Sequence, residues 1–413
     1  MNASFYHTFR VPCRTEISDK EQRSFPEKPW LQYSIDKGLV ARADPEGAVL
    51  VTPNHATPPI FVDNELLIKL QNSPINASSI PTTSFNLLER SGILKKGASE
   101  NSFQGMTTIN IAKMPFWSAI ETISTCQCHC WPCYRQDDLD GFQPPLSDII
   151  SRINKMQSFG ITFFEITGGE PLLRDDLVKI IAHLNGLPVH HILVTNGEYL
   201  KDAKSDLLIS LQSSHGVLIS LDGIGAKHDL VRRRPGLFDK IILGLERLKE
   251  YGIKTYFNST LYDYNINDVP GMIELARKYD TSIQLRPAIK TAAVEQNQLK
   301  PALITEALKE TLRSTGAHNA FAAVGSTMPP AHFYGCNILK NVAVDAQGNL
   351  FPCIMDRSRS IGNLEKMNFE QYAQSITEER QKLLGGDESC QDCSYKKDQM
   401  CGGFCRFSNS YKK

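Results

Sequence analysis

Three cysteines on one short segment carry the clearest chemical signal in the sequence. Cys126, Cys130 and Cys133 are separated by three and two residues within STCQCHCWPCY. Three thiolates on one loop can hold three irons of a cubane [4Fe–4S] cluster, which leaves the fourth iron open to another ligand. A zinc loop is the competing interpretation. Zinc ribbons pair two C-x-x-C knuckles, however, and no partner knuckle lies nearby, so the spacing favours the cluster.

The remaining cysteines are clustered as well. The chain has 413 residues and eleven cysteines, and of the others only Cys13 is isolated. Cys128 lies inside the loop but outside the register of the triplet, so we interpret it as a bystander, with a role as alternative ligand or redox group left open. A further group lies near the C-terminus: Cys336, Cys353, Cys390, Cys393, Cys401 and Cys405. In a reducing compartment such clustering indicates metal sites rather than disulfides.

Composition and charge narrow the class of protein. Apolar residues make up 41% and charged residues 22%, as in soluble globular proteins with a sizeable core. The 45 basic residues balance the 45 acidic ones, so no electrostatic footprint for nucleic acid or an acidic membrane is expected. There is no apolar run of transmembrane length, and the N-terminus lacks a basic region followed by an apolar stretch. We therefore expect a cytoplasmic protein.

From residue 117 to about 290, strand-like runs alternate with amphipathic helical stretches. The predicted strands are WSAIETIS, TFFEITGG, HHILVTNG, VLISLDG, KTYFNSTLY and SIQLRPAI. Six strand–helix units predict an α/β fold with a parallel sheet and right-handed crossovers. Four strands end in polar or glycine-rich segments, STCQCHC, GGEP, TNGE and LDG. Functional groups gather at the carboxyl ends of parallel strands, so we expect the site there.

The N-terminal part has a different pattern. Residues 1–25 are polar and indicate an irregular arm, and residues 38–62 contain the short strands LVARA, AVLV and IFVD. Helical spacing follows at 65–71 and 85–94. Residues 95–110 are rich in Gly, Ser and Thr, which is typical of a linker. Strands followed by helices predict a small separate module.

The cysteine loop resembles the radical S-adenosylmethionine (radical SAM) superfamily. The resemblance rests on the C-x3-C-x2-C spacing after a first strand, followed by the aromatic Tyr134. It implies a partial (β/α)6 barrel, a [4Fe–4S] cluster and S-adenosylmethionine bound at the open iron. In that family one electron from the cluster breaks a carbon–sulfur bond and releases a 5′-deoxyadenosyl radical. The electron would come from a donor such as a flavodoxin or ferredoxin.

Later strand ends match the same family. The GGEP element is expected to bind the amino end of the methionine moiety, and a simple βα turn is the alternative. The SLDG segment and the following H-D-x-x-R-x-x-x-G-x-F resemble the signature of the branch that modifies peptides and proteins. Ser220 and Arg232 would then contact the cofactor's carboxylate, unless Arg232 is an ordinary solvated arginine. Asn196 could reach ribose or methionine, or could be a turn residue. The expected cofactor-binding set is Tyr134, Gly168, Gly169, Glu170, Pro171, Asn196, Ser220, Asp222 and Arg232.

The C-terminal cysteines resemble the SPASM extension, which carries auxiliary iron–sulfur clusters. The segment VAVDAQGNLFPC predicts a hairpin with its turn at Asp345 to Gly348. The resemblance assigns Cys336, Cys353 and Cys405 to one cluster and Cys390, Cys393 and Cys401 to a second. Two features depart from the family: the x7 gap is longer than the usual x5, and no further cysteine precedes Lys413. We therefore expect one or two auxiliary clusters, with the fourth ligand of the second open. Zinc sites are the alternative, although six cysteines fill neither one nor two four-thiolate sites.

The layout of the front module resembles the winged-helix peptide clamps of maturases that act on ribosomally made peptides. A structural cap or another interaction module is the alternative. The expected domains are an irregular arm (1–25), a winged-helix-like peptide-recognition module (26–105), a radical SAM partial barrel (106–300) and a SPASM-like auxiliary iron–sulfur domain (301–413).

The predicted function is hydrogen abstraction from a residue of a ribosomal precursor peptide, leading to a thioether or another crosslink. Epimerisation and oxidation start from the same abstraction, and the sequence names no catalytic residue. The rival enzyme classes are anaerobic sulfatase maturases and tetrapyrrole-modifying enzymes. The rival outside enzymes is a zinc-stabilised interaction protein.

Overall fold

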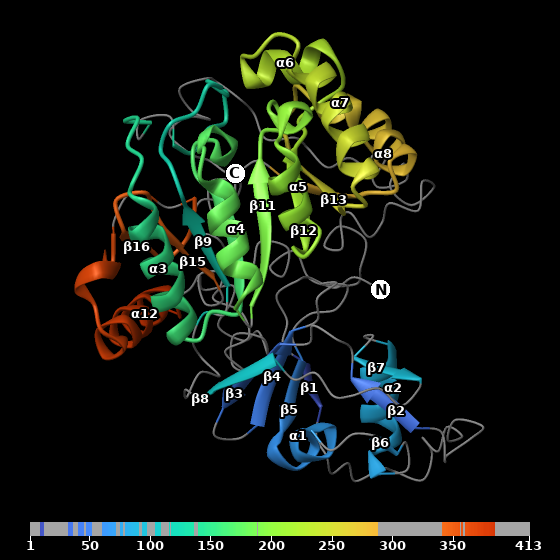
Figure 1. The fold of residues 1–413 in the computed structure, drawn as a ribbon, viewed down its shortest axis with the longest axis vertical. Coiled ribbons are helices and arrows are strands. Elements are labelled where there is room, and N and C mark those ends of the chain that lie inside the picture. The colour runs from blue at the N-terminus through green and yellow to red at the C-terminus, as the bar shows by residue number, and fades with distance from the viewer. Residues whose placement is uncertain are drawn as a thin grey trace.

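The computed structural model of the chain arranges its described residues in three sheets with helices packed against them (Figure 1). The described residues are 9–11, 32–35, 40–44, 47–51, 60–71, 75–76, 79–90, 93–96, 104–108, 115, 117–135, 139–187, 189–287, 341–355, 357 and 360–384.

The largest sheet has nine strands in the order β14-β13-β12-β11-β10-β9-β15-β16-β17. The six strands from β14 to β9 run parallel and form the partial barrel: β9 (Trp117–Glu121), β10 (Phe163–Thr167), β11 (His190–Thr195), β12 (Gly216–Ser220), β13 (Thr255–Leu261) and β14 (Ser282–Pro287). The helices between them are α3 (Leu146–Ser158), α4 (Leu177–Asn185), α5 (Ser205–Leu211), α6 (Ala226–Arg232), α7 (Leu237–Glu250) and α8 (Val269–Lys278). All six predicted strands are confirmed.

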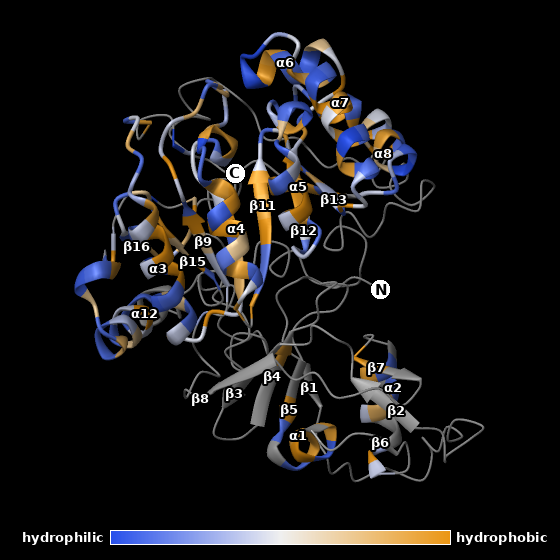
Figure 2. Ribbon diagram, viewed as in Figure 1, coloured by the Kyte–Doolittle hydropathy of each residue, from blue (hydrophilic) through white to orange (hydrophobic). Residues whose placement is uncertain are grey.

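Alternation along the strands separates an outer from an inner face of this sheet. Val217 and Ile219 belong to the main core, which also contains apolar residues of α3, α4, α7 and α8. Leu218 points the other way and packs with Trp117 and Phe163 in a second buried cluster. The helices show the matching pattern, with apolar stretches turned to the sheet and polar ones outward (Figure 2). The inner face of the barrel is therefore the face without helices.

The C-terminal region continues the same sheet. β15 (Asn341–Val344) pairs in parallel with β9, and the antiparallel strands β16 (Asn349–Phe351) and β17 (Gly362–Asn363) follow. The predicted hairpin turn is present, because the Gly348 N–H donates to the Asp345 carbonyl at 3.0 Å. Gly348 has φ +84°, a conformation that favours glycine.

A polar clamp and an aromatic stack fasten this region to the barrel. Arg152 of α3 donates through Nε to Glu365 at 2.6 Å and through Nη1 to the Ala346 carbonyl at 2.8 Å. The helix α12 (Phe369–Leu384) lies beside α3, and its Tyr372 stacks on Phe159 at 5.0 Å. The C-terminal region thus packs on the barrel as a continuation of its core.

The N-terminal region forms two smaller sheets, which Figure 1 draws below the barrel. The five-stranded sheet has the order β1-β5-β4-β3-β8, with β1 (Phe9–Val11), β3 (Val40–Asp44), β4 (Gly47–Val51), β5 (Ile60–Asp63) and β8 (Gln104–Thr108). The three-stranded sheet has the order β6-β2-β7, with β2 (Gln32–Ile35), β6 (Ile75–Asn76) and β7 (Leu94–Lys96). Two helices accompany them, α1 (Asn64–Gln71) and α2 (Thr82–Arg90).

Three expectations for this region need correction. The arm at 1–25 is not wholly irregular, because β1 pairs in parallel with β5. The linker expected at 95–110 contains β8, which pairs with β3. The helix expected at 85–94 ends at Arg90, and β7 begins at Leu94. Strands this short carry too little periodicity to be recognised from the sequence. Their pairing partners also lie far away along the chain, so no local pattern indicates the pairing. The winged-helix layout stays a prediction.

Candidate active site

The three cysteines of the triplet lie in the loop that follows β9, at the carboxyl edge of the sheet. Cys130 is buried, while Cys126 and Cys133 are half-buried, and all three are free thiols. Among the described residues, no three His, Cys, Asp or Glu side chains converge as ligands of a single ion. A cubane needs no such convergence, because each cysteine binds a different iron. Three cysteines on one loop are compatible with such a cluster.

The surroundings of the loop favour thiolates at two of the three cysteines. A hydrogen bond from the Cys128 thiol and the charge of Arg232 outweigh burial and lower the pKa of Cys130 to about 6. The same Cys128 thiol lowers the pKa of Cys126. Burial raises the pKa of Cys133 to about 11, so iron itself would have to displace that proton.

Cys128 has a place in this arrangement that its sequence position did not indicate. Its thiol is hydrogen-bonded to both Cys126 and Cys130, which, together with burial, raises the pKa of Cys128. Its backbone N–H also donates to the Cys126 sulfur at 3.4 Å. A protonated thiol has one hydrogen, so Cys128 can donate to Cys126 or to Cys130 at a given time, and it acts as a donor rather than as a ligand.

The GGEP element packs directly on the cysteine loop. The Gly169 N–H donates to the Ile123 carbonyl at 2.7 Å, and the Glu170 N–H donates to the Thr125 carbonyl at 2.8 Å. A Cβ at Gly169 would lie 2.1 Å from the Thr125 oxygen. Glycine was expected here for close approach to a ligand, and the structure shows a close approach to the loop that carries the cysteines.

Glu170 ties the end of β10 to the end of β11. Its buried carboxylate accepts from the Thr195 hydroxyl at 2.7 Å, the Asn196 N–H at 2.8 Å and the Leu172 N–H at 3.0 Å. Burial outweighs these hydrogen bonds and raises the pKa of Glu170 to about 7. Pro171 begins the short 3-10 helix that follows, η2 (Pro171–Leu173).

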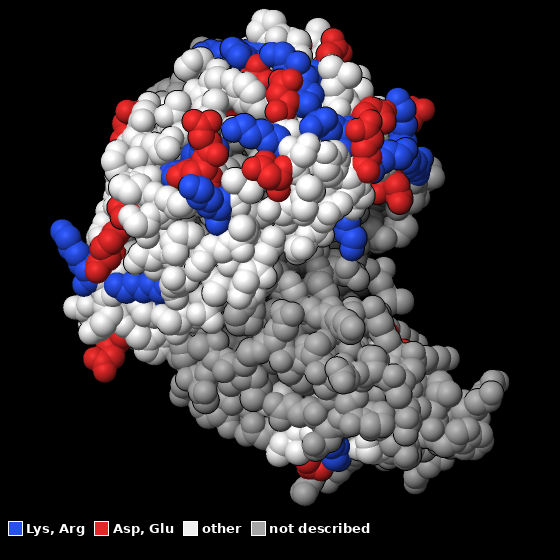
Figure 3. Space-filling model, viewed as in Figure 1, with Lys and Arg blue, Asp and Glu red and all other residues white. Residues whose placement is uncertain are grey.

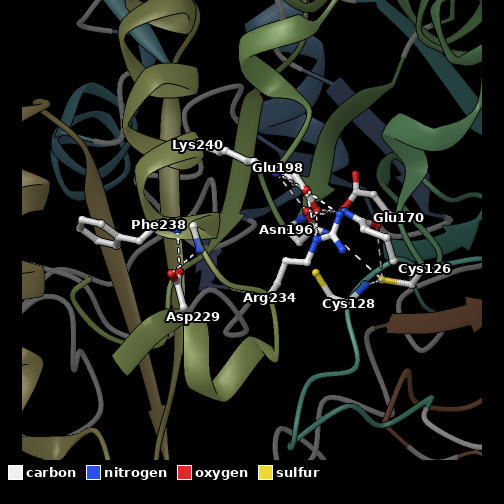
Figure 4. A network of polar contacts seen from close by, with 11 residues as sticks. Cys126, Cys128, Glu170, Asn196, Glu198, Asp229, Arg234, Phe238 and Lys240 are labelled. Atoms are coloured by element: carbon white, nitrogen blue, oxygen red, sulfur yellow. Dashed lines mark hydrogen bonds and ion pairs between the residues drawn. The ribbon is translucent and has the colours of Figure 1, made fainter. Parts of the chain in front are cut away.

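The H-D-x-x-R-x-x-x-G-x-F signature builds the turn between α6 and α7. The Asp222 N–H donates to Nδ1 of the buried His228 at 3.1 Å. Asp229 accepts from the backbone N–H groups of Gly236 at 2.6 Å and Phe238 at 2.8 Å (Figure 4). These contacts fix the start of α7 and hold α6 against the end of β12.

Arg232 is thereby presented to the cysteine loop. Its Nη2 lies 2.7 Å from the Asp222 carboxylate, and its Nη1 donates to the Cys130 sulfur at 3.7 Å. Its side chain is only 14% exposed, so Arg232 is not the solvated arginine that was the alternative. A guanidinium at this point can stabilise negative charge on the cluster ligand or on a bound carboxylate.

The inner face of the barrel carries a row of polar residues, Ser220, Asn258 and Gln284, which was not predicted from the sequence. The sheet register places Ser220 beside Asn258 and Asn258 beside Gln284. The Asn258 Oδ1 is buried and has no hydrogen-bond partner among the described residues. The only available signal was alternation in KTYFNSTLY, where Asn258 shares the face of Tyr256 and opposes the core residue Phe257.

Tyr134 marks where the C-terminal region meets the loop. The Arg357 guanidinium lies 5.7 Å from the centre of the Tyr134 ring. Burial raises the pKa of Tyr134, with smaller contributions from neighbouring groups that include Cys133 and Cys353. The half-buried Cys353 is thus near the loop. The other predicted auxiliary ligands lie outside the described residues: Cys336, Cys390, Cys393, Cys401 and Cys405.

The family model that matches the chain is that of the Radical SAM superfamily, over residues 120–276. Residues 120–276 therefore belong to the radical SAM superfamily. The matched segment runs from β9 through α8 and contains the cysteine triplet, GGEP and Arg232. Membership implies a [4Fe–4S] cluster and S-adenosylmethionine as cofactors, and the three cysteines of the loop are the residues that fit such a cluster.

Curated relatives match part of the chain. Fe-coproporphyrin III synthase of Methanosarcina barkeri is 31% identical over 152 residues, which cover 36% of this chain and 38% of that protein. GTP 3′,8-cyclase of Clostridium perfringens is 31% identical over 174 residues, which cover 40% of this chain and 53% of that protein. The chain therefore spans about half or less of the length of these relatives.

Solved structures match much more of the fold. Streptococcus suis SuiB bound to S-adenosylmethionine has a TM-score of 0.65 and 16% identity, and the match covers 92% of this chain and 97% of SuiB. The protein anSMEcpe with bound AdoMet and the Cp18Cys peptide has a TM-score of 0.51 and 17% identity, covering 71% and 89%. At this identity the likeness shows a shared fold that extends beyond the barrel.

Two surface features complete the description. Lysines and arginines lie interspersed with aspartates and glutamates over the described part of the barrel (Figure 3). Within the described residues, no helix combines the length and the apolar character that a membrane crossing requires.

Proposed function

We propose that this radical SAM enzyme abstracts hydrogen from a residue of a ribosomally made precursor peptide and forms a thioether or another crosslink. The observation that carries the proposal is the likeness to SuiB, which covers 92% of this chain and therefore includes much more than the barrel. A second SuiB structure is bound to the precursor peptide SuiA, and it matches with a TM-score of 0.59.

The N-terminal region supports a peptide partner. Its three-stranded antiparallel sheet has β6 and β7 as its outer strands among the described residues. An extended peptide can add to such an edge through main-chain hydrogen bonds. Peptide clamping by this region remains part of the proposal.

The residues around the loop divide the work of holding the cofactors. Cys126, Cys130 and Cys133 would hold the cluster, and Arg232 and Ser220 would face the carboxylate of S-adenosylmethionine. When bound, these cofactors supply a 5′-deoxyadenosyl radical. The inner face of the barrel would receive the substrate, where the unpartnered Oδ1 of Asn258 could accept from an N–H group of a peptide backbone.

The C-terminal region would supply the auxiliary chemistry. Cys353, between β16 and β17, lies near Tyr134, the residue that follows Cys133. An auxiliary cluster held by Cys353 and the neighbouring C-terminal cysteines would bind a substrate thiolate or accept the electron left as the new bond forms. A flavodoxin or ferredoxin would reduce the radical SAM cluster.

A second candidate function is modification of a tetrapyrrole. It is favoured by Fe-coproporphyrin III synthase, at 31% identity, and by pre-heme d1 synthase of Dinoroseobacter shibae, at 30%. Both matches cover less than 40% of those proteins and are confined to 36% of this chain. The likeness to SuiB covers 92% of this chain, which is why the peptide interpretation is preferred.

The test offers the reconstituted full chain three substrates under dithionite: a Cys-containing precursor peptide encoded beside its gene, a sulfatase-derived peptide and Fe-coproporphyrin III. A crosslinked precursor peptide loses two hydrogens, which mass spectrometry detects. Product from the precursor peptide alone supports the proposal. Turnover of the porphyrin or of the sulfatase peptide without change in the precursor peptide contradicts it.

A further inference from the structure

Glu198 lies just beyond the end of β11 and is the centre of a network of hydrogen bonds and ion pairs. Its side chain is 2% exposed. Its carboxylate accepts from Arg234 Nε at 2.8 Å, Lys240 Nζ at 2.6 Å and Gln127 Nε2 at 2.9 Å (Figure 4). Arg234 precedes α7, Lys240 lies within α7, and Gln127 follows the cluster cysteine Cys126. The network therefore joins α7 to the cysteine loop.

Its electrostatics keep Glu198 ionised. Burial alone would raise the pKa of Glu198, yet hydrogen bonds from Arg234, Lys240 and Gln127 bring it down to about 2. Two cationic partners already stabilise the ionised carboxylate, so a third, neutral donor is not required to keep it charged. The Gln127 amide is held here all the same, which points to a role for Glu198 beyond its ion pairs.

That role becomes visible at Asn196. The Asn196 Oδ1 accepts from Gln127 Nε2 at 3.2 Å and from the Glu198 N–H at 3.0 Å. Because both contacts need an oxygen acceptor, the orientation of the Asn196 amide is determined, and its NH2 group has to point away. It points to the Cys126 sulfur, to which Nδ2 donates at 3.9 Å.

We propose that Glu198 is a positioning residue that acts through Gln127 to hold Asn196 as an N–H donor to Cys126, and so raises the reduction potential of the cluster. Hydrogen bonds to cluster sulfurs stabilise the reduced, more negative state and are a known determinant of potential. The proposal concerns reduction of the cluster, so it goes beyond the proposed function and does not depend on the substrate.

The experiment is a redox titration of the anaerobically reconstituted full chain without substrate, followed by electron paramagnetic resonance of the reduced cluster. Asn196→Ala removes the donor and is expected to lower the midpoint potential. Gln127→Ala, which changes no charge, is expected to lower it in the same direction. Iron content and circular dichroism of each variant establish that the cluster and the fold are intact.

Glu198→Gln needs a double-mutant cycle, because loss of a negative charge by itself raises the potential. The change in midpoint potential caused by Glu198→Gln is expected to be more negative in the wild-type background than in the Asn196→Ala background. In Asn196→Ala the donor to Cys126 is already absent, so only the effect of the lost charge remains. Lys227→Met, on the exposed rim of α6, is the matched control and is expected to leave the potential unchanged. Equal shifts of Glu198→Gln in both backgrounds, or an unchanged potential in Asn196→Ala, would overturn the proposal.

Discussion

Arg357 donates to the carboxylate of Glu121, a residue 236 positions earlier in the chain. Glu121 is the last residue of β9 and is fully buried, and its other oxygen accepts from Arg135 Nη1 at 2.5 Å. Arg135 comes two residues after Cys133, and Arg357 comes four residues after Cys353. One buried carboxylate therefore joins the radical SAM loop to the C-terminal region.

Glu121→Ala is predicted to destabilise the protein by about 3–5 kcal/mol, because it leaves two buried guanidinium groups without their counter-charge. Arg357→Ala should cost less, since Arg135 still neutralises Glu121. Urea unfolding of the purified chain measures both. Lys227→Ala removes one partner of the exposed pair with Asp268 and should cost at most about 1 kcal/mol. If Glu121→Ala and Lys227→Ala lower the free energy of unfolding equally, the ion pairs of Glu121 do not stabilise the contact between the loop and the C-terminal region.

The elements that could be predicted from the sequence are those with a local pattern of apolar and polar residues. β10 and β12 are short apolar runs bounded by polar and glycine-rich segments, and α7 repeats apolar residues at helical spacing. Pairing between β9 and β15 left no such trace, because parallel pairing of distant segments depends on the whole fold. The strands β1 and β8 were not predicted for the same reason, because each pairs in parallel with a distant segment.

The candidate site divides in the same way. Cys126, Cys130 and Cys133 have a characteristic spacing, so they were recognisable in the chain. Glu198 was not, since an acidic residue after TNG looks like any loop glutamate until Arg234 and Lys240 are seen to converge on it. The role of Cys128 depends on sulfur positions that no spacing rule specifies.

Alanine at Cys126, Cys130 or Cys133 is predicted to abolish formation of 5′-deoxyadenosine and to remove about four irons per chain, since each position would lose one ligand of the cubane. Cys128→Ala removes only a hydrogen-bond donor. It should retain the iron and most of the cleavage activity. Iron and sulfide analysis with chromatographic detection of deoxyadenosine measures both effects. A full iron content in Cys133→Ala, or loss of the cluster in Cys128→Ala, would reverse the ligand assignment.

Cys353→Ala is predicted to spare deoxyadenosine formation and to stop product formation, because it would remove a ligand of the proposed auxiliary cluster only. Cys405→Ala should behave in the same way, as predicted from its place in the C-x3-C pair. The wild-type chain should contain roughly eight or more irons, and each variant should lose up to about four. Normal product formation in both variants would remove the auxiliary clusters from the reaction.

The buried His191 is predicted to make the protein sensitive to acid. Burial lowers the pKa of His191 from 6.5 to about 4. Below pH 6.5 the unfolded chain takes up a proton that the folded chain refuses until the pH nears 4, so stability falls across this window. At about 1.4 kcal/mol per pKa unit the loss is on the order of 3 kcal/mol.

The measurement compares urea unfolding at pH 7.5 and pH 5. His191→Phe should lose less stability than the wild type on acidification, although His228, whose pKa burial lowers to about 3, keeps part of the slope. His183→Phe, at a half-exposed position of α4, is the control and should follow the wild type closely. An acid loss in His191→Phe as large as that of the wild type would count against the prediction.

Asn258 is predicted to contact the substrate, because its unpartnered Oδ1 lies on the inner face beside Ser220. Asn258→Ala should reduce product formation from a peptide substrate by about tenfold, equivalent to one lost hydrogen bond of roughly 1.4 kcal/mol. Cleavage of S-adenosylmethionine without substrate should be unchanged. Asn258→Asp keeps the acceptor, so it should retain more activity than Asn258→Ala if the peptide offers an N–H group. Ser259→Ala is the matched control, since Ser259 points to the opposite face and contacts Met272. If Asn258→Ala and Ser259→Ala turn over the peptide equally well, the inner-face row does not bind the substrate.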